Sequence, residues 1–260
     1  MSSDRDLYTF GDGDVASRRL ARLSAAYEAE TRDLIARAIV GPPALALDLG
    51  CGPGWTTSLV HEASGAARTV GVDVSDRFVD EARRRHPSLE FVVADVVQSL
   101  PVAGADFVFA RFLLTHLSRP ADALAAWAAA AAPGARLALH ETTAIMSAHP
   151  ALARYYDLVA ALQAHHGQNL RIGAVLDDAL AATRWRLVES LELPLEKPAA
   201  VMAEIHAANL RTWRVTPFAR DTFDPRELDA LERSLDAIAA GREPSPPVHN
   251  IARQVIAALD

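Results

Sequence analysis

From residue 44 onward, short apolar runs alternate with amphipathic stretches, and this pattern predicts strands that alternate with helices. Alternation of this kind gives right-handed βαβ units and a parallel sheet that is covered on both faces. The predicted strands are 44–49, 69–74, 89–94, 105–110, 135–140 and 184–193. The predicted helices are 53–63, 75–86, 118–131, 198–213 and 225–240.

Capping residues support two of these helices. Ser75 is a candidate N-cap for one, and Ser118, with Pro120 in the first turn, for the other. Beyond residue 141 the pattern becomes helical as far as residue 182, and residues 248–258 fit either a strand or a helix. We expect one domain, 1–260, with a core at 44–140, an N-terminal helical lid at 1–40, and helical cap insertions at 142–182 and 197–245.

Composition points to an ordinary globular chain. Half of its 260 residues are apolar and 23% are charged, and a domain of this size needs no disulfide or metal for stability. Cys51 is the only cysteine, which favours a cytoplasmic location. Lys197 is the only lysine, and the many arginines and alanines indicate a GC-rich bacterial genome.

Charge and hydropathy exclude several kinds of partner. The net charge of −7 argues against a general nucleic-acid binder, and the basic run at 83–85 ends a predicted helix, where cations favour the dipole. The apolar stretch 121–132 is too short to span a bilayer, and the first 14 residues contain no secretory signal. We therefore expect a small-molecule substrate, no nucleic acid, no membrane, and a monomer or homodimer.

Residues 47–54 read Leu-Asp-Leu-Gly-Cys-Gly-Pro-Gly and join a predicted strand to a predicted helix. Glycines in such a loop allow a tight turn and let a nucleotide approach the backbone, although dinucleotide-binding proteins use nearly the same device. Asp48 favours another ligand, because a carboxylate there repels a pyrophosphate and attracts a cofactor that carries an ammonium and a sulfonium. The third glycine, Gly54, also comes one residue too early for Gly-x-Gly-x-x-Gly.

Two further acids end the next two strands. Asp73 is suited to accept hydrogen bonds from ribose hydroxyls, and Asp95 lies within reach of an adenine amino group. Either acid alone is explained as well by a helix cap or a solvated turn. Three acids on successive strand ends favour a binding site, because open sheets bind ligands at that edge.

These segments resemble the motifs of class I S-adenosylmethionine-dependent methyltransferases. Residues 47–54, 71–75 and 94–95 are similar to the first three motifs, 106–117 to the fourth, and 133–139 to the turn into strand five. The resemblance implies an α/β, Rossmann-like, seven-stranded, mostly parallel sheet with an antiparallel last strand, which favours a strand at 248–258. It implies S-adenosylmethionine as the cofactor, bound by Asp48, Gly50, Cys51, Gly52, Asp73, Val74, Asp95, Val96 and Arg111.

The N-terminal segment also resembles small-molecule methyltransferases of this class, in which it folds over the methionine end of the cofactor. Tyr8 is then placed to close the pocket, and Arg19 to pair with the cofactor carboxylate. An amphipathic surface helix explains the same residues without a ligand. Cys51 is expected to offer its backbone N–H, with no role for a reactive thiol.

The sequence shows no catalytic dyad. Methyl transfer is an in-line displacement for which the protein supplies mainly alignment, and a base is needed only if the acceptor must lose a proton. His116, His140 and His166 are the candidate bases, although His116 is equally explained by packing beside the cofactor.

The segment 142–182 should roof the substrate, and the second cap contributes an aromatic residue. Candidate substrate contacts are Tyr155, His165, His166 and Trp213. Trp213 is also explained as a packing aromatic. No His-x₃-His spacing supports a metal site built from His140, Glu141 and the 165–166 pair, so no metal is expected.

The sequence therefore predicts methyl transfer from S-adenosylmethionine to an oxygen, nitrogen or carbon of a small molecule, with secondary metabolites as one fitting class. One alternative is a protein that binds this cofactor and catalyses a non-methylating reaction, for which no demethylated cofactor would form on turnover. A second is a non-catalytic partner subunit, which would fail to bind the cofactor. A third, an NAD-dependent oxidoreductase, predicts better nucleotide binding after Asp48→Ala.

Overall fold

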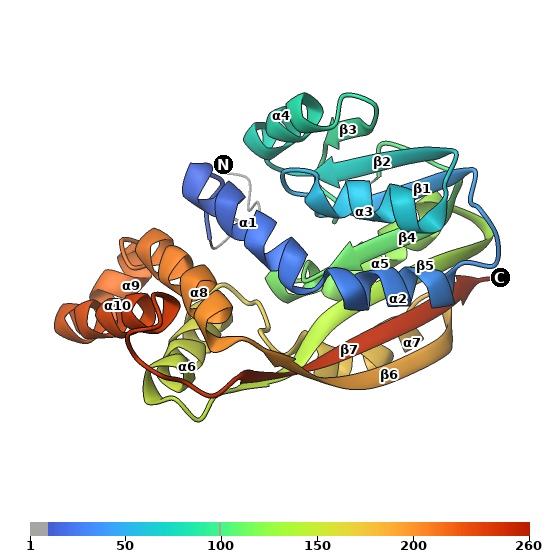
Figure 1. Cartoon of the computed structure of the whole chain (residues 1–260). Helices are drawn as coiled ribbons and strands as arrows, with labels where there is room; N and C mark the ends of the chain where they lie inside the picture. Colours follow the sequence, from blue (N-terminus) through green and yellow to red (C-terminus); the bar gives the residue numbers. More distant parts are fainter. Residues whose placement is uncertain (1–9, 99) are drawn as a thin grey trace.

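A seven-stranded sheet forms the centre of the computed structural model, which describes residues 10–98 and 100–260. Its strand order is β3-β2-β1-β4-β5-β7-β6, and β7 alone runs antiparallel to its neighbours (Figure 1). The predicted Rossmann-like sheet with an antiparallel last strand is confirmed. The strands are β1 Leu45–Leu49, β2 Arg68–Asp73, β3 Glu90–Val93, β4 Ala105–Arg111, β5 Ala131–Met146, β6 Trp185–Lys197 and β7 Val248–Leu259.

Helices follow most of the strands, as the alternating pattern predicts. Ser75 caps α4 by accepting a hydrogen bond from Phe78 N at 3.1 Å, whereas Arg119, and not Ser118, occupies the N-cap of α5. The helices are α1 Asp14–Ala26, α2 Glu28–Ala38, α3 Trp55–Ser64, α4 Asp76–Arg85, α5 Pro120–Ala130, α6 Pro150–His165, α7 Leu176–Ala181, α8 Ala199–Trp213, α9 Pro217–Thr222 and α10 Pro225–Ala239. Two 3₁₀ turns are η1 Leu114–His116 and η2 Ile172–Val175.

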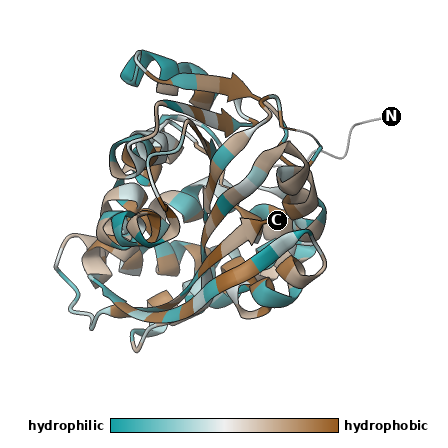
Figure 2. Ribbon diagram, turned by 90° about the vertical axis from the view of Figure 1, so that its right-hand side faces the viewer, coloured by the Kyte–Doolittle hydropathy of each residue, from teal (hydrophilic) through white to brown (hydrophobic). Residues whose placement is uncertain are grey.

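The central strands β1 and β4 are buried on both faces, which explains why they are almost continuously apolar. On one face, Leu34 and Ile35 of α2 pack with Phe107 and Phe109 of β4. On the other face, α5 and α7 contribute a second cluster around Trp127. Hydrophobic residues recur along the strands in Figure 2, as this double burial requires.

The strands β5 and β6 are longer than the sequence pattern predicts. Residues 142–146 continue β5 where a helix was expected, and they pair with β7 as far as Met146 and His249. Thr142, Thr143 and Ile145 are β-branched and suit a strand once a partner is available. Consequently β5, β7 and β6 project beyond the rest of the sheet and carry the cap (Figure 1).

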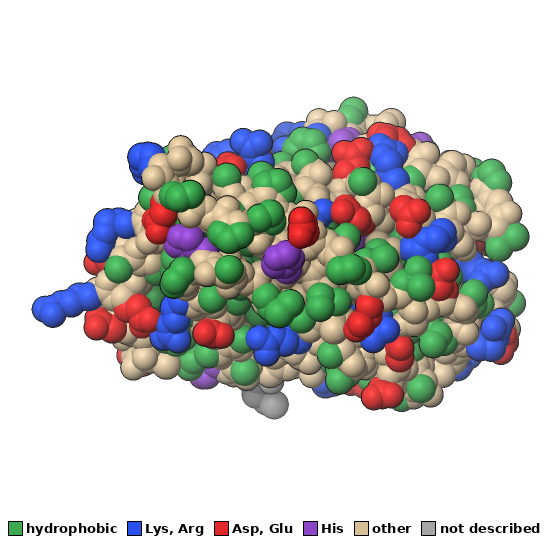
Figure 3. Space-filling model, turned by 60° about the horizontal axis from the view of Figure 1, so that its bottom comes forward, with side chains coloured by type: hydrophobic (Ala, Val, Ile, Leu, Met, Phe, Trp, Pro, Cys, Tyr) green, Lys and Arg blue, Asp and Glu red, His purple; other side chains and the backbone are tan. Residues whose placement is uncertain are grey.

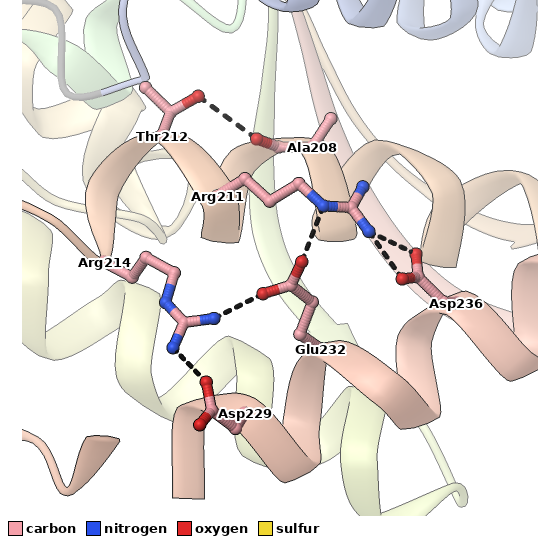
Figure 4. A network of polar contacts seen from close by, with 7 residues as sticks. All are labelled: Ala208, Arg211, Thr212, Arg214, Asp229, Glu232 and Asp236. Carbon is pink, nitrogen blue, oxygen red and sulfur yellow. Dashed lines mark hydrogen bonds and ion pairs between the residues drawn. The ribbon is translucent and has the colours of Figure 1, made fainter. Parts of the chain in front are cut away.

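The cap consists of α6, α8, α9 and α10 around a separate hydrophobic cluster. Arg211 of α8 pairs with Glu232 and Asp236 of α10, and Arg214 pairs with Glu232 and Asp229 (Figure 4). The helix α9 was not predicted from the sequence. Residues of the cap cluster include Leu152, Leu158, Leu162, Leu210, Trp213, Leu231 and Leu235.

The two N-terminal helices have different surroundings. α1 lies beside the carboxyl ends of the parallel strands and next to α8, whereas α2 packs against the sheet (Figure 1). Lys197, at the end of β6, joins them, because its Nζ donates to Ala26 O and to Glu30 Oε1, each at 2.6 Å. The chain's only lysine therefore ties the cap-bearing strand to the junction between α1 and α2.

The surface shows no concentration of one charge on the face drawn in Figure 3, where acidic and basic side chains are interspersed among apolar ones. None of the helices within residues 10–98 and 100–260 combines the length and apolar character needed to cross a membrane.

Candidate cofactor and acceptor site

The loop after β1 turns through left-handed backbone conformations that favour glycine. Gly50 has φ 71° and Gly52 has φ 52°, and a Cβ on Gly50 would lie 2.8 Å from Leu113 Cδ1. The amides of Gly50 and Cys51 both donate to Val72 O, which holds the loop against the end of β2. Burial raises the pKa of the Cys51 thiol well above its ordinary value, so this side chain behaves as an apolar group.

Asp48 lies fully inside the molecule, behind the glycine loop. Its Oδ2 accepts a hydrogen bond from Thr57 Oγ1 of α3 at 2.7 Å. Burial raises the pKa of Asp48 to about 7, against the opposing effects of that hydrogen bond and the Arg111 charge. A cation bound nearby would favour the ionised form, so this carboxyl is suited to respond to a positively charged ligand.

Asp73 connects the glycine loop to the start of α4. Its Oδ2 accepts from Gly52 N at 2.8 Å, and its Oδ1 accepts from Ser75 N at 2.9 Å. A carboxylate offers about four acceptor positions, so the backbone amides around Asp73 leave room for a ribose hydroxyl. Val74, the next residue, is 42% exposed beside it. These residues fit a cofactor that carries a ribose.

Asp95 lies on the neighbouring strand end. Ala94 N donates to Asp73 O at 2.9 Å, which brings the ends of β2 and β3 together. The Asp95 carboxylate accepts from Val97 N and from Gln98 Nε2, each at 2.9 Å. Val96 is buried, and its carbonyl accepts from Trp127 Nε1. The acids Asp48, Asp73 and Asp95 thus lie at or just beyond the ends of three adjacent strands, close to where the sequence predicts.

The turn after β4 is held by a carboxyl group from β5. Glu141 Oε1 accepts from Leu113 N at 2.9 Å and from Leu114 N at 2.8 Å. Burial raises the pKa of Glu141 to about 8. Phe112, just before these amides, has φ 53°, a strained conformation for a non-glycine residue that the surrounding contacts must enforce. Glu141 therefore shapes the turn that carries His116.

Arg111 ends β4 and points back toward the N-terminal helices. Its Nη1 donates to Thr31 Oγ1 of α2 at 2.7 Å, and its Nη2 lies 3.5 Å from Thr56 Oγ1 of α3. Burial lowers the pKa of Arg111 to about 10. This guanidinium supplies a positive charge close to Asp48.

His116 ends η1 at the same edge of the sheet. Its Nδ1 lies 3.3 Å from Gln163 Nε2 of α6, and its ring meets the edge of Phe10 at 5.5 Å between centroids. Burial, together with the Arg19 charge, lowers the pKa of His116 to about 3. The ring is therefore neutral near pH 7, and too weakly basic to deprotonate a hydroxyl or an ammonium efficiently.

The other two candidate bases have different surroundings. His140 is fully buried, with Nδ1 3.2 Å from Gln254 Nε2 and its ring beside Phe112; burial lowers its pKa to about 3. His166 caps the end of α6. Among residues 10–98 and 100–260, no three His, Cys, Asp or Glu side chains are grouped to hold a metal ion.

The candidate substrate residues lie in the cap, each beside other cap residues. His165 stacks on Phe218 of α9 at 4.0 Å between centroids. Tyr155 stacks on His206 at 4.3 Å, and Trp213 packs in the cap cluster beside Phe223. Tyr8 lies outside the described residues.

Two polar residues of α8 were not singled out from the sequence. His206 and Asn209 are buried on the face of α8 that also carries Trp213, at spacings of seven and four residues from it. Tyr156 OH lies 2.9 Å from His206 Nε2. Burial, together with the Arg19 charge, lowers the pKa of His206 to about 3. Polar residues on the buried face of an amphipathic helix were the signal that could have identified them.

A cavity of about 860 Å³ opens between α1, α3 and α8. Arg19, only 5% exposed, lines it and places its guanidinium over the Phe10 ring at 5.4 Å. Neither the glycine loop nor the three acids contribute to its walls, which include Trp55, His86, Glu204, Ile205 and Ala208.

This chain is similar to known proteins in sequence and in fold. Residues 46–134 match a family described as a methyltransferase domain. Trans-aconitate 2-methyltransferase from Azoarcus sp. strain BH72 is 33% identical over 183 residues, covering 59% of this chain and 71% of the relative. The enzyme of the same name from Rhodopseudomonas palustris strain BisB18 is 31% identical over 224 residues, covering 68% and 84%. The fold is similar to that of a geranyl diphosphate methyltransferase solved with S-adenosylmethionine, with a TM-score of 0.56, 15% identity, and coverage of 96% and 92%.

The strand order and the loop after β1 define the class first: a Rossmann-like protein that binds a nucleotide cofactor at the carboxyl edge of its sheet. The relatives then give the family, and the chain belongs to the class I S-adenosylmethionine-dependent methyltransferases. It is an enzyme that transfers a methyl group from S-adenosylmethionine to a small-molecule acceptor.

Proposed function

We propose that the acceptor is a small carboxylic acid, which the enzyme converts to a methyl ester. The observation that carries this proposal is the weak basicity of the buried histidines His116, His140 and His206, whose pKa values all lie at about 3. A phenol, alcohol or ammonium must lose a proton to react, whereas a carboxylate is already ionised near pH 7. The relatives named trans-aconitate 2-methyltransferase make trans-aconitate the first acid to test.

The chemistry of a carboxylate acceptor also suits a buried site. The carboxylate oxygen attacks the methyl carbon in line with sulfur, the O–C bond forms, and the C–S electron pair goes to sulfur. Opposite charges cancel as the oxygen anion meets the sulfonium, so a site of low polarity favours the reaction over bulk water. The chain then has to align two partners and exclude water, with no proton to remove.

For the cofactor, we propose the strand-end residues already described together with the lid. Arg19 would pair with the carboxylate of the methionine end and Tyr8 would close over it. His116 would lie beside the reacting groups as a neutral wall, and His140 and His166 would have no proton to remove from an ionised acceptor. The cofactor residues proposed are Asp48, Gly50, Cys51, Gly52, Asp73, Val74, Asp95, Val96 and Arg111.

The purified enzyme, incubated with S-adenosylmethionine, is offered trans-aconitate, a catechol and a primary amine in parallel. We expect a methyl ester of the acid, detected by mass spectrometry with an equal amount of demethylated cofactor. We also expect kcat to stay nearly constant from pH 6 to 9. Preferred methylation of the catechol or the amine, with kcat rising as pH increases, would contradict the proposal.

We also propose that the enzyme is a cytoplasmic monomer or homodimer without a nucleic-acid or membrane partner. The net charge of −7 and the single, buried cysteine support this. Light scattering coupled to size-exclusion chromatography tests the oligomeric state, and a tetramer or larger assembly would contradict it.

A further inference from the structure

We infer that Tyr27 is a positioning residue for the cofactor, because its ring holds in place the turn that supports the glycine loop. The inference rests on the proposed placement of S-adenosylmethionine at that loop. Tyr27 is 1% exposed and lies at the junction where α1 ends, at Ala26, and α2 begins, at Glu28. Its effect on the loop passes through Phe112 and Leu113.

The turn after β4 needs support because its backbone is strained. Phe112 has φ 53°, in the left-handed region that residues other than glycine rarely adopt. Its N–H donates to His140 O at 2.9 Å, and the next two amides donate to Glu141 Oε1. Such a conformation persists only where several surrounding contacts enforce it. These hydrogen bonds hold the backbone of the turn, and contacts with the Phe112 ring hold its side chain.

The Phe112 ring packs against two other rings. Tyr27 meets it edge to face, with 4.9 Å between centroids, and His140 does so at 5.1 Å. Tyr27 and His140 also meet each other at 5.7 Å and a right angle. Pairs of rings in this arrangement stabilise one another beyond the apolar area that they bury. Removing the Tyr27 ring therefore takes away two of the three contacts in the group.

Tyr27 is itself held from two strands of the sheet. Asn250 Nδ2 of β7 donates to its OH at 2.8 Å, and Lys197 Nζ of β6 lies 4.3 Å from its ring centroid. A cation at this distance is attracted to the face of an aromatic ring. Burial raises the pKa of the Tyr27 phenol, so its OH stays protonated and neutral. The ring is thus a fixed support for Phe112.

Leu113 transmits the position of the turn to the glycine loop. A Cβ on Gly50 would lie 2.8 Å from Leu113 Cδ1 and 3.2 Å from its Cδ2, so the leucine side chain lies directly against the glycine. Gly50 N in turn donates to Val72 O at 2.8 Å. If the strained turn relaxes, Leu113 moves away from Gly50 and the loop loses its support on that side. The loop would then bind the cofactor more weakly.

The test compares Tyr27→Leu and Tyr27→Phe with the wild type. Tyr27→Leu keeps an apolar side chain and removes the ring, so we expect the Kd of S-adenosylmethionine, measured by calorimetry, to rise about tenfold. Tyr27→Phe keeps the ring and removes the OH that accepts from Asn250. It should lower the melting temperature and keep the Kd within about twofold of the wild type.

Ile35→Ala is the matched control for loss of stability. Ile35 is fully buried on α2, where it packs with Phe107 and Phe109 of β4. The substitution leaves a cavity and should lower the melting temperature at least as much as Tyr27→Leu. Its Kd should nevertheless stay within about twofold of the wild type, because Ile35 packs in a different cluster from the turn.

Two substitutions of Phe112 test whether Tyr27 acts through the turn, and they decide the question if Tyr27→Leu does not fold. Phe112→Gly and Phe112→Ala both remove the ring, but only glycine adopts φ 53° without strain. Phe112→Gly should therefore bind the cofactor more tightly than Phe112→Ala. In the Phe112→Gly background, Tyr27→Leu should raise the Kd less than about twofold, because the ring that Tyr27 supports is already absent.

The inference is wrong if Tyr27→Leu keeps the Kd of Ile35→Ala, or if Phe112→Ala binds as tightly as Phe112→Gly. It is also wrong if Tyr27→Leu raises the Kd equally with and without the Phe112 ring, since Tyr27 would then act through α1. Asp73→Asn separates these outcomes from the proposed cofactor site. If Asp73→Asn weakens binding and Tyr27→Leu does not, the inference alone fails; if neither weakens binding, both fail.

Discussion

Asp73 joins the glycine loop to the start of α4 at the proposed cofactor edge. Its single carboxylate accepts the Gly52 amide from the glycine loop and the Ser75 amide from the start of α4. Both oxygens must therefore be acceptors, and an amide side chain cannot reproduce this arrangement because one of its two ends is a donor. The same oxygens are those proposed to meet the ribose.

Asp73→Asn should weaken S-adenosylmethionine binding about ten- to hundredfold, because hydrogen bonds to an ionised group are lost. Calorimetric titration measures the Kd, and the melting temperature reports the cost to the loop. Asp95→Asn is the comparison, since the described partners of the Asp95 carboxylate lie two and three positions along its own turn, and its effect should be smaller. An unchanged Kd for Asp73→Asn would remove Asp73 from the cofactor site.

Glu141 makes stability depend on pH in an unusual direction. Its pKa is raised from 4.5 to about 8 by burial, so between these values the folded chain holds a proton that the unfolded chain has released. The contribution of Glu141 to the free energy of unfolding therefore falls as pH rises through this window, while His116, His140 and His206, whose pKa burial lowers from 6.5 to about 3, act in the opposite direction below pH 6.5. Asp48, raised from 3.8 to about 7, acts in the same direction as Glu141 up to neutral pH.

Glu141→Gln removes one of these two titrations and keeps an oxygen for the amides of Leu113 and Leu114. We expect the fall in melting temperature between pH 6.5 and 8.5, above the titration of the histidines in the unfolded chain, to be smaller in the variant than in the wild type. The remaining slope should come from Asp48 and end near pH 7. Parallel melting curves for the two proteins across this range would show that Glu141 is ionised in the folded state.

At the scale of elements, helix α1, the proposed lid, is fastened to α4 by polar contacts at the end of the sheet. Ser75 Oγ donates to Asp12 at 2.9 Å, Arg77 pairs with Asp14 at 2.6 Å, and Ser17 Oγ donates to Glu81 at 2.5 Å. Exposed ion pairs add little to stability. Because these contacts join α1 to α4, we expect them to affect separation of the two helices more than folding.

The double variant Ser17→Ala/Arg77→Ala should release S-adenosylmethionine faster, while its melting temperature changes little. Stopped-flow displacement of the bound cofactor measures the dissociation rate. Arg68→Ala is a suitable control, because it removes an exposed ion pair with Glu90 that joins β2 to β3. Equal dissociation rates in the double variant and the control would mean that these contacts do not hold the lid.

The elements show where prediction from sequence succeeds and where it stops. The strands of the core and the cap of α4 at Ser75 follow from local patterns, and the structure has them within a few residues. Residues 142–146 were expected to be helical because their partner, β7, lies about a hundred residues further on. Pairing over that distance leaves no periodic signal near residue 142.

Prediction of the candidate site from the sequence has the same limit. The glycine loop and the three acids are visible because a few neighbouring residues carry the chemistry. The strained conformation of Phe112 cannot be predicted from nearby residues, because the carboxyl group that holds its turn belongs to Glu141 on β5. His206 and Asn209 are ordinary residues of an amphipathic helix until α1 and α6 are packed against them.

At the scale of the whole molecule, three strands belong to the core and the cap at once. β5 and β7 pair from Arg136 with Ala258 to Met146 with His249, and β6 follows β7 along its whole length. The cap cluster and the sheet are therefore joined by two antiparallel strand pairings, each interrupted by a single register shift. We expect the chain to unfold as one cooperative unit despite its two hydrophobic clusters.

Leu210→Ala tests this coupling from the cap, since Leu210 is fully buried in the cap cluster. The substitution should lower the free energy of unfolding by about 2–5 kcal/mol. Scanning calorimetry should show a single transition shifted to lower temperature, and hydrogen exchange should speed up in β1 and β4 as well as in α8. Two separate transitions, or faster exchange confined to the cap, would show that the cap unfolds independently.

Lys197 gives the molecule a built-in chemical reporter. Its side-chain amine is the only one in the sequence, and it is buried between Ala26 O and Glu30 at the junction of α1 and α2. An acylating reagent can reach it only in molecules whose α1–α2 junction has separated from the end of β6. The rate at which Lys197 is labelled, with and without cofactor, would therefore measure how often that end of the lid opens.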